Sequence, residues 1–221
     1  MKKNKRVLVN FLFALVTCVA IIGLSSPSFS SQIAQSPDWL NQQLLSNLQQ
    51  AESVITAQMT PAQDMPAQDR PAQMMPAQMM PTQTMTRYVA VLTKDAVVPT
   101  KPSNAAFGAA GAVLVGDRLV MRGDFSNLSS PLRDYATDPV SPANPNITSA
   151  VHIHRGESTK NGPFQYALTV NPNESGMGGR FAGEYTLTSE QQQALSNGML
   201  YVDIHTKKNR AGELRGILRS Y

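Results

Sequence analysis

The three histidines of this chain are the residues best suited to bind a metal ion. His152 and His154 lie two positions apart and alternate with the apolar residues Val151 and Ile153. On a β-strand, side chains two positions apart leave on the same face, so both imidazoles should point away from the core. The later run 200–205 alternates in the same way and places His205 on the non-core face of its strand.

If these two strands are neighbours, the three imidazoles converge. Three nitrogen ligands with an open position are typical of zinc and copper sites. The sequence therefore predicts a mononuclear copper or zinc site formed by His152, His154 and His205, whose binding should weaken as the pH falls through about 6.5. The alternative interpretation is that these histidines are hydrogen-bonded structural residues beneath the loop 133–148, which is rich in proline and asparagine.

Three charged residues near the C-terminus are assigned structural roles. Glu213 and Arg215 share one face of their predicted strand, and the simplest account is an ion-pair network with Asp203 or Glu184. A catalytic carboxylate pair is the alternative. No serine, cysteine or lysine nucleophile lies in a recognisable motif beside them, so we name no catalytic residue and no cofactor other than copper or zinc.

Four short blocks follow one another in the last third of the chain: VHIHRG at 151–156, NGP at 161–163, YVDIHT at 201–206 and GELRG at 212–216. Together they resemble the chordin-type (CHRD) domain, which is found in animal chordins and in many secreted bacterial proteins. The resemblance covers roughly residues 88–218. It implies a β-sandwich in an exported protein and no settled activity. The cysteine-rich modules that bind growth factors in chordins are missing from this sequence, so growth-factor binding is not implied.

The His-x-His pair is also similar to the copper ligands of copper-zinc superoxide dismutase. This sequence has no further histidines for a bridging ligand or for a separate zinc site, which argues against a dismutase. A dismutase-like enzyme or an uncharacterised hydrolase is therefore the second alternative, behind a metal-binding protein.

The first 30 residues have the composition of a secretory signal peptide. Four basic residues at positions 2–6 precede an apolar run over 7–24, and Ser28 and Ser30 fit the small-x-small rule for cleavage. We expect cleavage after Ser30, with Ala34 as second choice, and an uncleaved membrane anchor is the competing interpretation. Cys18 is the only cysteine, so removal of this segment would leave no thiol for a disulfide or a metal.

The same segment accounts for the formal net charge of +4. Removing its four basic residues from the 19 Lys and Arg leaves 15, which equals the 15 Asp and Glu. A neutral chain without a basic, aromatic-rich patch is not suited to nucleic acid or to anionic membranes. We therefore expect no nucleic acid partner, and no membrane partner beyond the signal peptide.

Residues 31–59 are predicted to form an amphipathic helical segment. Ser36, Pro37 and Asp38 suit the N-cap, the first helical position and the first turn, and apolar residues recur at helical spacing as far as Ile55. Such a helix packs on its own domain or on a second copy of the chain. The alternative is that this helix binds a separate partner protein.

Residues 60–86 are a Pro/Met/Gln-rich pentapeptide repeat with prolines at 61, 66, 71, 76 and 81. Proline at every fifth position removes backbone donors too often for a helix or a sheet, which predicts a disordered linker outside the folded unit. The methionines could hold Cu(I) or act as sacrificial targets of oxidation. A drifting low-complexity linker is the simpler interpretation.

Residues 87–221 show short alternating runs separated by turn residues. Strands are expected at 88–92, 111–115, 118–125, 164–170, 180–187, 199–206 and 213–219, with Gly116 and Asp117 as one hairpin turn. Thr188 to Gln191 has capping-box spacing and opens one short helix, which Asn197 and Gly198 end. This pattern predicts an all-β domain, an antiparallel β-sandwich of the immunoglobulin or superoxide-dismutase type.

These patterns together predict a secreted, periplasmic or extracellular CHRD-domain protein. We expect a non-catalytic binding or envelope-associated module whose partner is an unknown protein or envelope component. A copper- or zinc-binding protein is the first alternative, and metal analysis of the purified protein separates the two.

Overall fold

The computed structural model describes residues 38–59 and 84–221. The predicted signal peptide and residues 60–83 of the predicted linker lie outside these ranges. In chain order the elements are α2 (Asp38–Met59), β1 (Met85–Thr93), the short 3-10 helix η1 (Lys94–Ala96), β2 (Phe107–Val115), β3 (Arg118–Ser126), β4 (Val151–Arg155), β5 (Phe164–Ala167), β6 (Thr169–Pro172), β7 (Gly179–Thr186), α3 (Ser189–Ser196), β8 (Leu200–Ile204), β9 (Leu214–Ile217) and β10 (Arg219–Ser220).

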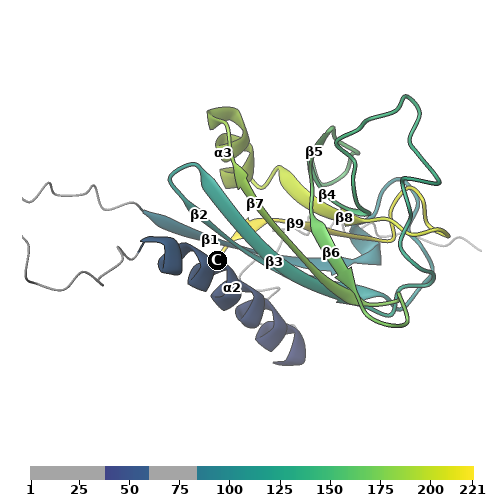
Figure 1. The fold of residues 1–221 in the computed structure, drawn as a ribbon, viewed down its shortest axis with the longest axis horizontal. Coiled ribbons are helices and arrows are strands. Elements are labelled where there is room, and N and C mark those ends of the chain that lie inside the picture. The colour runs from purple at the N-terminus through teal and green to yellow at the C-terminus, as the bar shows by residue number, and fades with distance from the viewer. Residues whose placement is uncertain (1–37, 60–83) are drawn as a thin grey trace, which may run out of the picture.

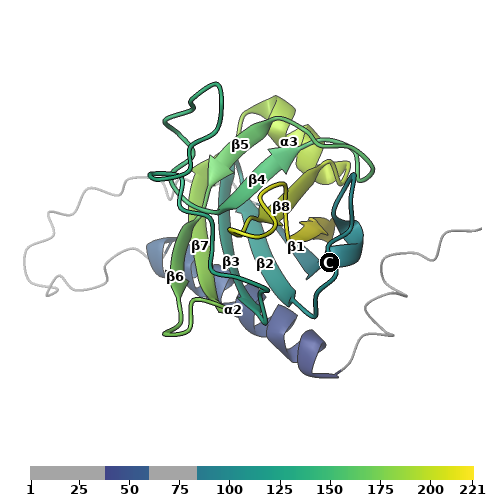
Figure 2. The ribbon, with the colours of Figure 1, turned by 90° about the vertical axis from the view of Figure 1, so that its right-hand side faces the viewer.

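The strands of the described residues form one ten-stranded antiparallel sheet. Its order is β5-β4-β8-β9-β1-β2-β3-β7-β6, with β10 paired to β1. Figures 1 and 2 show this sheet curling around a central core. β5 and β6 stand at opposite ends of the order, yet the single residue Leu168 joins them in the chain. The sheet therefore nearly closes on itself like a barrel.

The mainly antiparallel β architecture is as predicted, but the strands do not divide into the two stacked sheets of the predicted sandwich. Short alternating strands are compatible with both a sandwich and a barrel. The deciding pairings are non-local: β1 lies between β9 and β2, which come from opposite ends of the domain. Strand periodicity carries no information about such neighbours.

The interior of the barrel is filled by alternating side chains of the strands. Val151 and Ile153 of β4, and Leu200, Val202 and Ile204 of β8, belong to this core and are fully buried, in agreement with the alternation of the sequence. The opposite faces of β4 and β8 are also buried, with His152 and Asp203 almost inaccessible. These two strands therefore separate an apolar interior from a polar buried layer.

Helix α2 packs on the outside of β1, β2 and β3 (Figure 1). Its buried residues contact apolar residues on the outer sheet face; the set comprises Leu40, Leu44, Leu48, Ala51 and Ile55 on the helix, and Val89, Ala109, Val113, Val115 and Val120 on the strands. A Cβ on Gly111 would lie 2.4 Å from the backbone nitrogen of Leu48, so only glycine permits this close approach. β2 is thus covered on both faces.

The predicted short helix is confirmed as α3. Thr188 and Gln191 form the capping box, and Gly198 follows with a φ of 65°. Gly116 likewise adopts a φ of 60° in the turn between β2 and β3. Over the described ranges, no helix is long and apolar enough to cross a membrane.

Candidate metal centre

The pairing of β4 with β8 brings the three histidines together. In this antiparallel register His152 lies opposite Asp203, and His154 lies opposite Tyr201. His205 directly follows β8, and its backbone nitrogen donates to the carbonyl of Ala150 at 2.9 Å. The condition on which the predicted cluster depended, that these two strands are neighbours, is therefore met.

One ring nitrogen from each histidine lies within 4.8 Å of the others. The ring centroids are 4.9 Å apart for His152 and His205, 5.6 Å for His152 and His154, and 6.2 Å for His154 and His205. A tetrahedral ion bound at about 2.0–2.1 Å holds its nitrogens about 3.4 Å apart. Closing the cluster around such an ion therefore requires the longest nitrogen separation to shorten by at most about 1.4 Å.

Each imidazole contacts a backbone carbonyl through one of its ring nitrogens. His154 Nδ1 lies 3.0 Å from the carbonyl oxygen of Gly162, and His205 Nδ1 lies 3.0 Å from that of Arg210. His152 Nε2 lies 2.6 Å from the carbonyl oxygen of Ser149. A carbonyl only accepts hydrogen bonds, so each of these nitrogens carries the proton, and the second nitrogen of each neutral ring keeps its lone pair. Outer contacts of this kind fix ring orientation in metal-binding histidines.

Two of the lone-pair nitrogens are buried without a partner. Nε2 of His154 and Nε2 of His205 make no hydrogen bond to any described residue. A buried acceptor left unpaired costs about 1–3 kcal/mol of free energy. A bound cation would give both nitrogens a partner, and the neutral donor set fits Zn(II) or Cu(II).

Burial keeps these rings neutral. It lowers the pKa of His152 to about 3, with His205 as a second cause, and it lowers the pKa of His205 to about 4. The pKa of His154 is also lowered, first by burial. The predicted loss of metal binding near pH 6.5 therefore needs correction, because it assumed the pKa of an exposed histidine, and proton competition in the folded protein begins at lower pH.

Aromatic rings enclose the histidines. Tyr135 lies 5.3 Å from His152 and 6.4 Å from His205 between ring centroids, and Phe164 packs edge-on against His152 at 5.3 Å. Tyr201 stacks almost parallel to His154 at 5.4 Å. The loop 133–148, which was expected to lie over the histidines, supplies Tyr135 to this layer, and Ser149, which follows it, supplies a carbonyl. It also borders a hollow of about 520 Å³.

Arg215 and Asp203 form a buried ion pair beside the histidines. Nε and Nη2 of Arg215 donate to the two carboxylate oxygens of Asp203 at 2.8 and 2.9 Å. The guanidinium also lies 4.2 Å from the ring centroid of Tyr201 and donates to the side chain of Asn161 at 2.6 Å. This pair links β8, β9 and the NGP block to the ring that stacks on His154.

Glu213 lies in a separate cluster. Its buried carboxylate accepts from the Thr206 hydroxyl at 2.6 Å, from the Ser129 backbone nitrogen at 2.5 Å and from the Asn209 amide at 3.1 Å. Glu184, the alternative partner considered for the ion-pair network, is exposed and instead pairs with the half-buried Arg118 at 2.6 Å. Glu213 therefore ties the loop after β3 to the loop after β8.

Several contributors to the cluster were not identified from the sequence. Tyr135 lies in a loop without periodicity, and the carbonyls of Ser149, Gly162 and Arg210 depend on backbone position rather than on residue type. The NGP block did offer a signal: a Cβ on Gly162 would lie 1.8 Å from the carbonyl oxygen of Arg155. Only glycine can therefore occupy the position that contacts His154 through its carbonyl and Tyr201 through its N–H.

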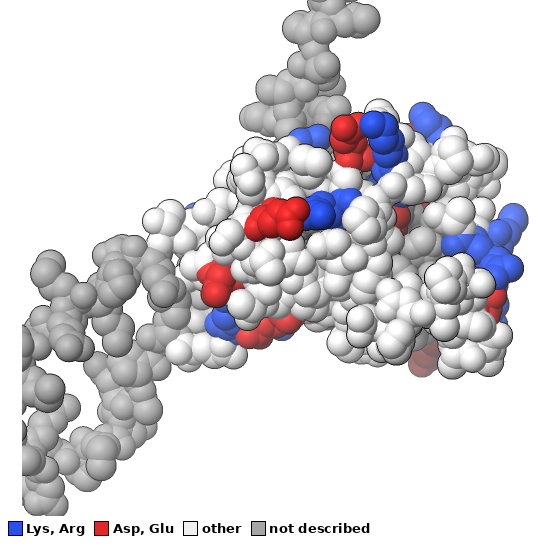
Figure 3. Space-filling model, turned by 90° about the horizontal axis from the view of Figure 1, so that it is seen from above, with Lys and Arg blue, Asp and Glu red and all other residues white. Residues whose placement is uncertain are grey.

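The surface shows no concentration of one charge on the face seen in Figure 3, where acidic and basic side chains are interspersed among uncharged ones. No curated protein and no solved structure is significantly similar to this chain. The family model of the CHRD domain matches residues 88–218, which include the three histidines, the NGP block and Arg215. This match covers more than half of the sequence, and the chain therefore belongs to the CHRD-domain family.

Proposed function

We propose that this chain is an exported CHRD-domain protein that binds one copper or zinc ion through His152, His154 and His205. The observation that carries the proposal is the different environment of the two nitrogens in each imidazole ring. One nitrogen of each ring contacts a backbone carbonyl, which leaves the other nitrogen with its lone pair. One ring nitrogen of each histidine also lies within 4.8 Å of those of the other two. Three neutral nitrogens also leave a coordination position for water or an external ligand.

Metal titration of the purified, chelator-treated protein tests this function. Calorimetry with Zn(II) and with Cu(II) should give one ion per chain, and His154→Ala should abolish that binding. The chain has only three histidines, so coupling to imidazole nitrogen in the pulsed electron paramagnetic resonance spectrum of bound Cu(II) can come only from these residues. Equal binding by wild type and His154→Ala would refute the proposal.

The methionines of the predicted linker provide the matched control. Replacing Met74, Met75, Met79 and Met80 by leucine removes soft sulfur ligands and leaves the histidines intact. Zn(II) and Cu(II) binding should be unchanged in this variant. Loss of binding there would instead assign the metal to the linker.

Export is the second part of the proposal, supported by the basic, apolar and small-residue order of the first 30 residues. The exported protein should then begin between Ser31 and Gln35, which mass spectrometry of the intact chain measures. Retention of Met1 or Lys2 would point to a membrane anchor. Outside the cell, the domain would act as a metal-carrying binding module at the envelope or in the medium.

A further inference from the structure

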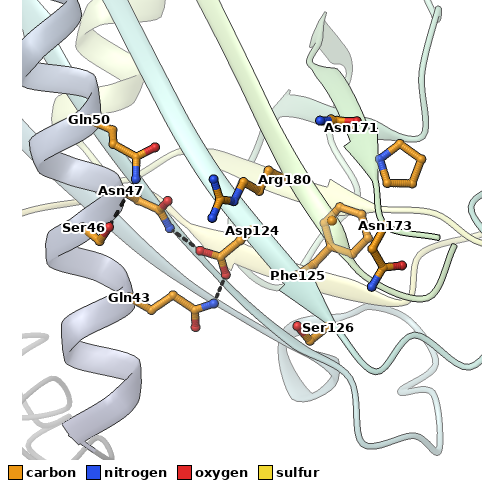
Figure 4. A pocket seen from close by; sticks show the side chains of 12 residues that line it. Gln43, Ser46, Asn47, Gln50, Asp124, Phe125, Ser126, Asn171, Asn173 and Arg180 are labelled. Atoms are coloured by element: carbon orange, nitrogen blue, oxygen red, sulfur yellow. Dashed lines mark hydrogen bonds between the residues drawn. The ribbon is translucent and has the colours of Figure 1, made fainter. Parts of the chain in front are cut away.

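We propose that the groove between α2 and the sheet is a binding site for a short oligosaccharide. Two hollows, of about 570 and 220 Å³, lie along the helix and share four lining residues: Asn47, Gln50, Asn171 and Arg180. The larger hollow is shown in Figure 4. Because the two share lining residues, they form one elongated groove, with α2 as one wall and β3, β6 and β7 as the other.

The groove presents polar side chains that both donate and accept hydrogen bonds. Figure 4 shows Gln43, Asn47 and Gln50 on α2 facing the strands that carry Asp124 and Arg180. Asn171 and Asn173 supply two further amides on the strand side. A side-chain amide offers two donors and one acceptor oxygen, which match sugar hydroxyls that donate and accept at once.

Asp124 and the helix amides are held in fixed orientations. Nδ2 of Asn47 donates to Asp124 at 2.7 Å and to the carbonyl of Ala109 at 3.2 Å, and the Gln43 amide also donates to Asp124. The Gln43 carbonyl oxygen is buried and accepts no hydrogen bond from any described residue.

The charges and the buried aromatic residues of the groove argue against nucleic acid as its ligand. Arg180 is exposed, has no ion pair within the described ranges and lies close enough to influence Asp124. Arg122, which borders the smaller hollow, is a second cation and lies close enough to influence Glu184 of β7. Nucleic acid would require several cations and exposed aromatic platforms. Phe125 and Phe181, the aromatic residues that border the groove, are buried in the core, with 1% and 2% of their surface exposed. The amide-rich lining favours a hydroxyl-rich ligand, and we assign the groove to a neutral oligosaccharide.

The groove depends on a part of the chain outside the family domain. The CHRD match begins at residue 88, whereas one wall of the groove is α2. The metal cluster lies on β4 and after β8, which do not border the groove. Sugar binding should therefore be the same in metal-loaded and chelator-treated protein. A failure of one proposal would leave the other unaffected.

Nuclear magnetic resonance titration of the full chain tests the proposal. The probes are chitohexaose, cellohexaose, maltohexaose and the acidic hexagalacturonate, each at low millimolar concentration. We expect at least one neutral hexasaccharide to shift the side-chain amide signals of Asn47 and Asn171. Absence of any shift with all four probes, or binding of hexagalacturonate alone, would overturn the assignment to a neutral oligosaccharide.

Two exposed groove residues and one matched control locate the site. Asn171→Ala should weaken binding about fivefold, and Arg180→Ala about tenfold or more, from the usual worth of a neutral and a charged hydrogen bond. Gln49→Ala removes an exposed amide of the same helix that does not line the groove and should leave binding unchanged. Binding that is equally strong in all three variants would place the sugar elsewhere.

Discussion

The metal-free protein should lose stability between pH 6.5 and pH 5 because its histidines are buried in the neutral form. The pKa of a histidine in the unfolded chain is about 6.5. In the folded protein it falls to about 3 for His152 and about 4 for His205. Between these limits the unfolded chain binds more protons than the folded one, so protons favour unfolding. The stabilising contribution is therefore complete above about pH 6.5 and declines as the pH falls towards the folded-state values.

The size of the effect follows from the width of that window. Each pH unit within it changes the free energy of unfolding by about 1.4 kcal/mol for each histidine. From pH 6.5 to pH 5, each of the two rings therefore removes roughly 2 kcal/mol, and the pair removes roughly 4 kcal/mol. The pKa of His154 is shifted in the same direction and adds to the loss. A domain of ordinary stability has about 5–15 kcal/mol, so the change is large.

Urea unfolding of the chelator-treated protein, followed by far-ultraviolet circular dichroism at pH 7.5, 6.5, 5.5 and 5.0, measures this dependence. The control is a double variant, His152→Asn with His205→Gln, whose replacements do not titrate. It should be less stable at pH 7.5 and show a much flatter slope. A wild-type loss below about 1 kcal/mol, or the same slope in the double variant, would show that these histidines are not buried as neutral rings.

Three further changes test the metal site, the ion pair and the helix. Zn(II) affinity should fall by less than tenfold per pH unit from pH 7 to about pH 5.5, because the folded-state pKa values of His152 and His205 are about 3 and about 4 and the pKa of His154 is also lowered. A tenfold loss per pH unit above pH 5.5 would contradict this. Asp203→Asn should lower the free energy of unfolding by about 3–5 kcal/mol, because Arg215 would keep a buried charge without its partner. Glu184→Gln breaks an exposed ion pair and should cost less than about 1 kcal/mol. Equal costs in urea unfolding would disprove the role of burial. Leu48→Ala should lower the free energy of unfolding by about 2–5 kcal/mol, whereas Leu45→Ala, at an exposed position of the same helix, should change it little. Similar urea midpoints for the two variants would mean that α2 does not contribute to stability.

The sequence was most informative where the relevant contacts are local. The two-residue period of β4 and β8 correctly separated core residues such as Val151 and Val202 from the histidine face. The capping box at Thr188 located α3 because it depends on residues only three positions apart. In both cases the chemistry that decides the structure lies within one element.

Long-range pairing limited the rest. The neighbour relation of β4 and β8 involves residues about fifty positions apart, and no local pattern encodes it. The closure of the sheet depends on the same kind of contact, so a sandwich and a barrel were equally consistent with the strands. The sequence left two acidic partners open for the ion-pair network, Asp203 and Glu184. The register of β8 with β9 places Asp203 opposite Arg215 and so decides between them.

The environment of the histidines indicates why this layer holds its shape without an ion. Three carbonyls orient the rings, and the Arg215–Asp203 pair fixes Tyr201 against His154. Under the proposed function the ligands would be arranged before binding, so little ordering would remain to oppose the affinity for an ion. The same arrangement leaves Nε2 of His154 and Nε2 of His205 buried and without a hydrogen bond from any described residue. An ion bound at this place would supply the partner that both nitrogens lack, which a purely structural role would not.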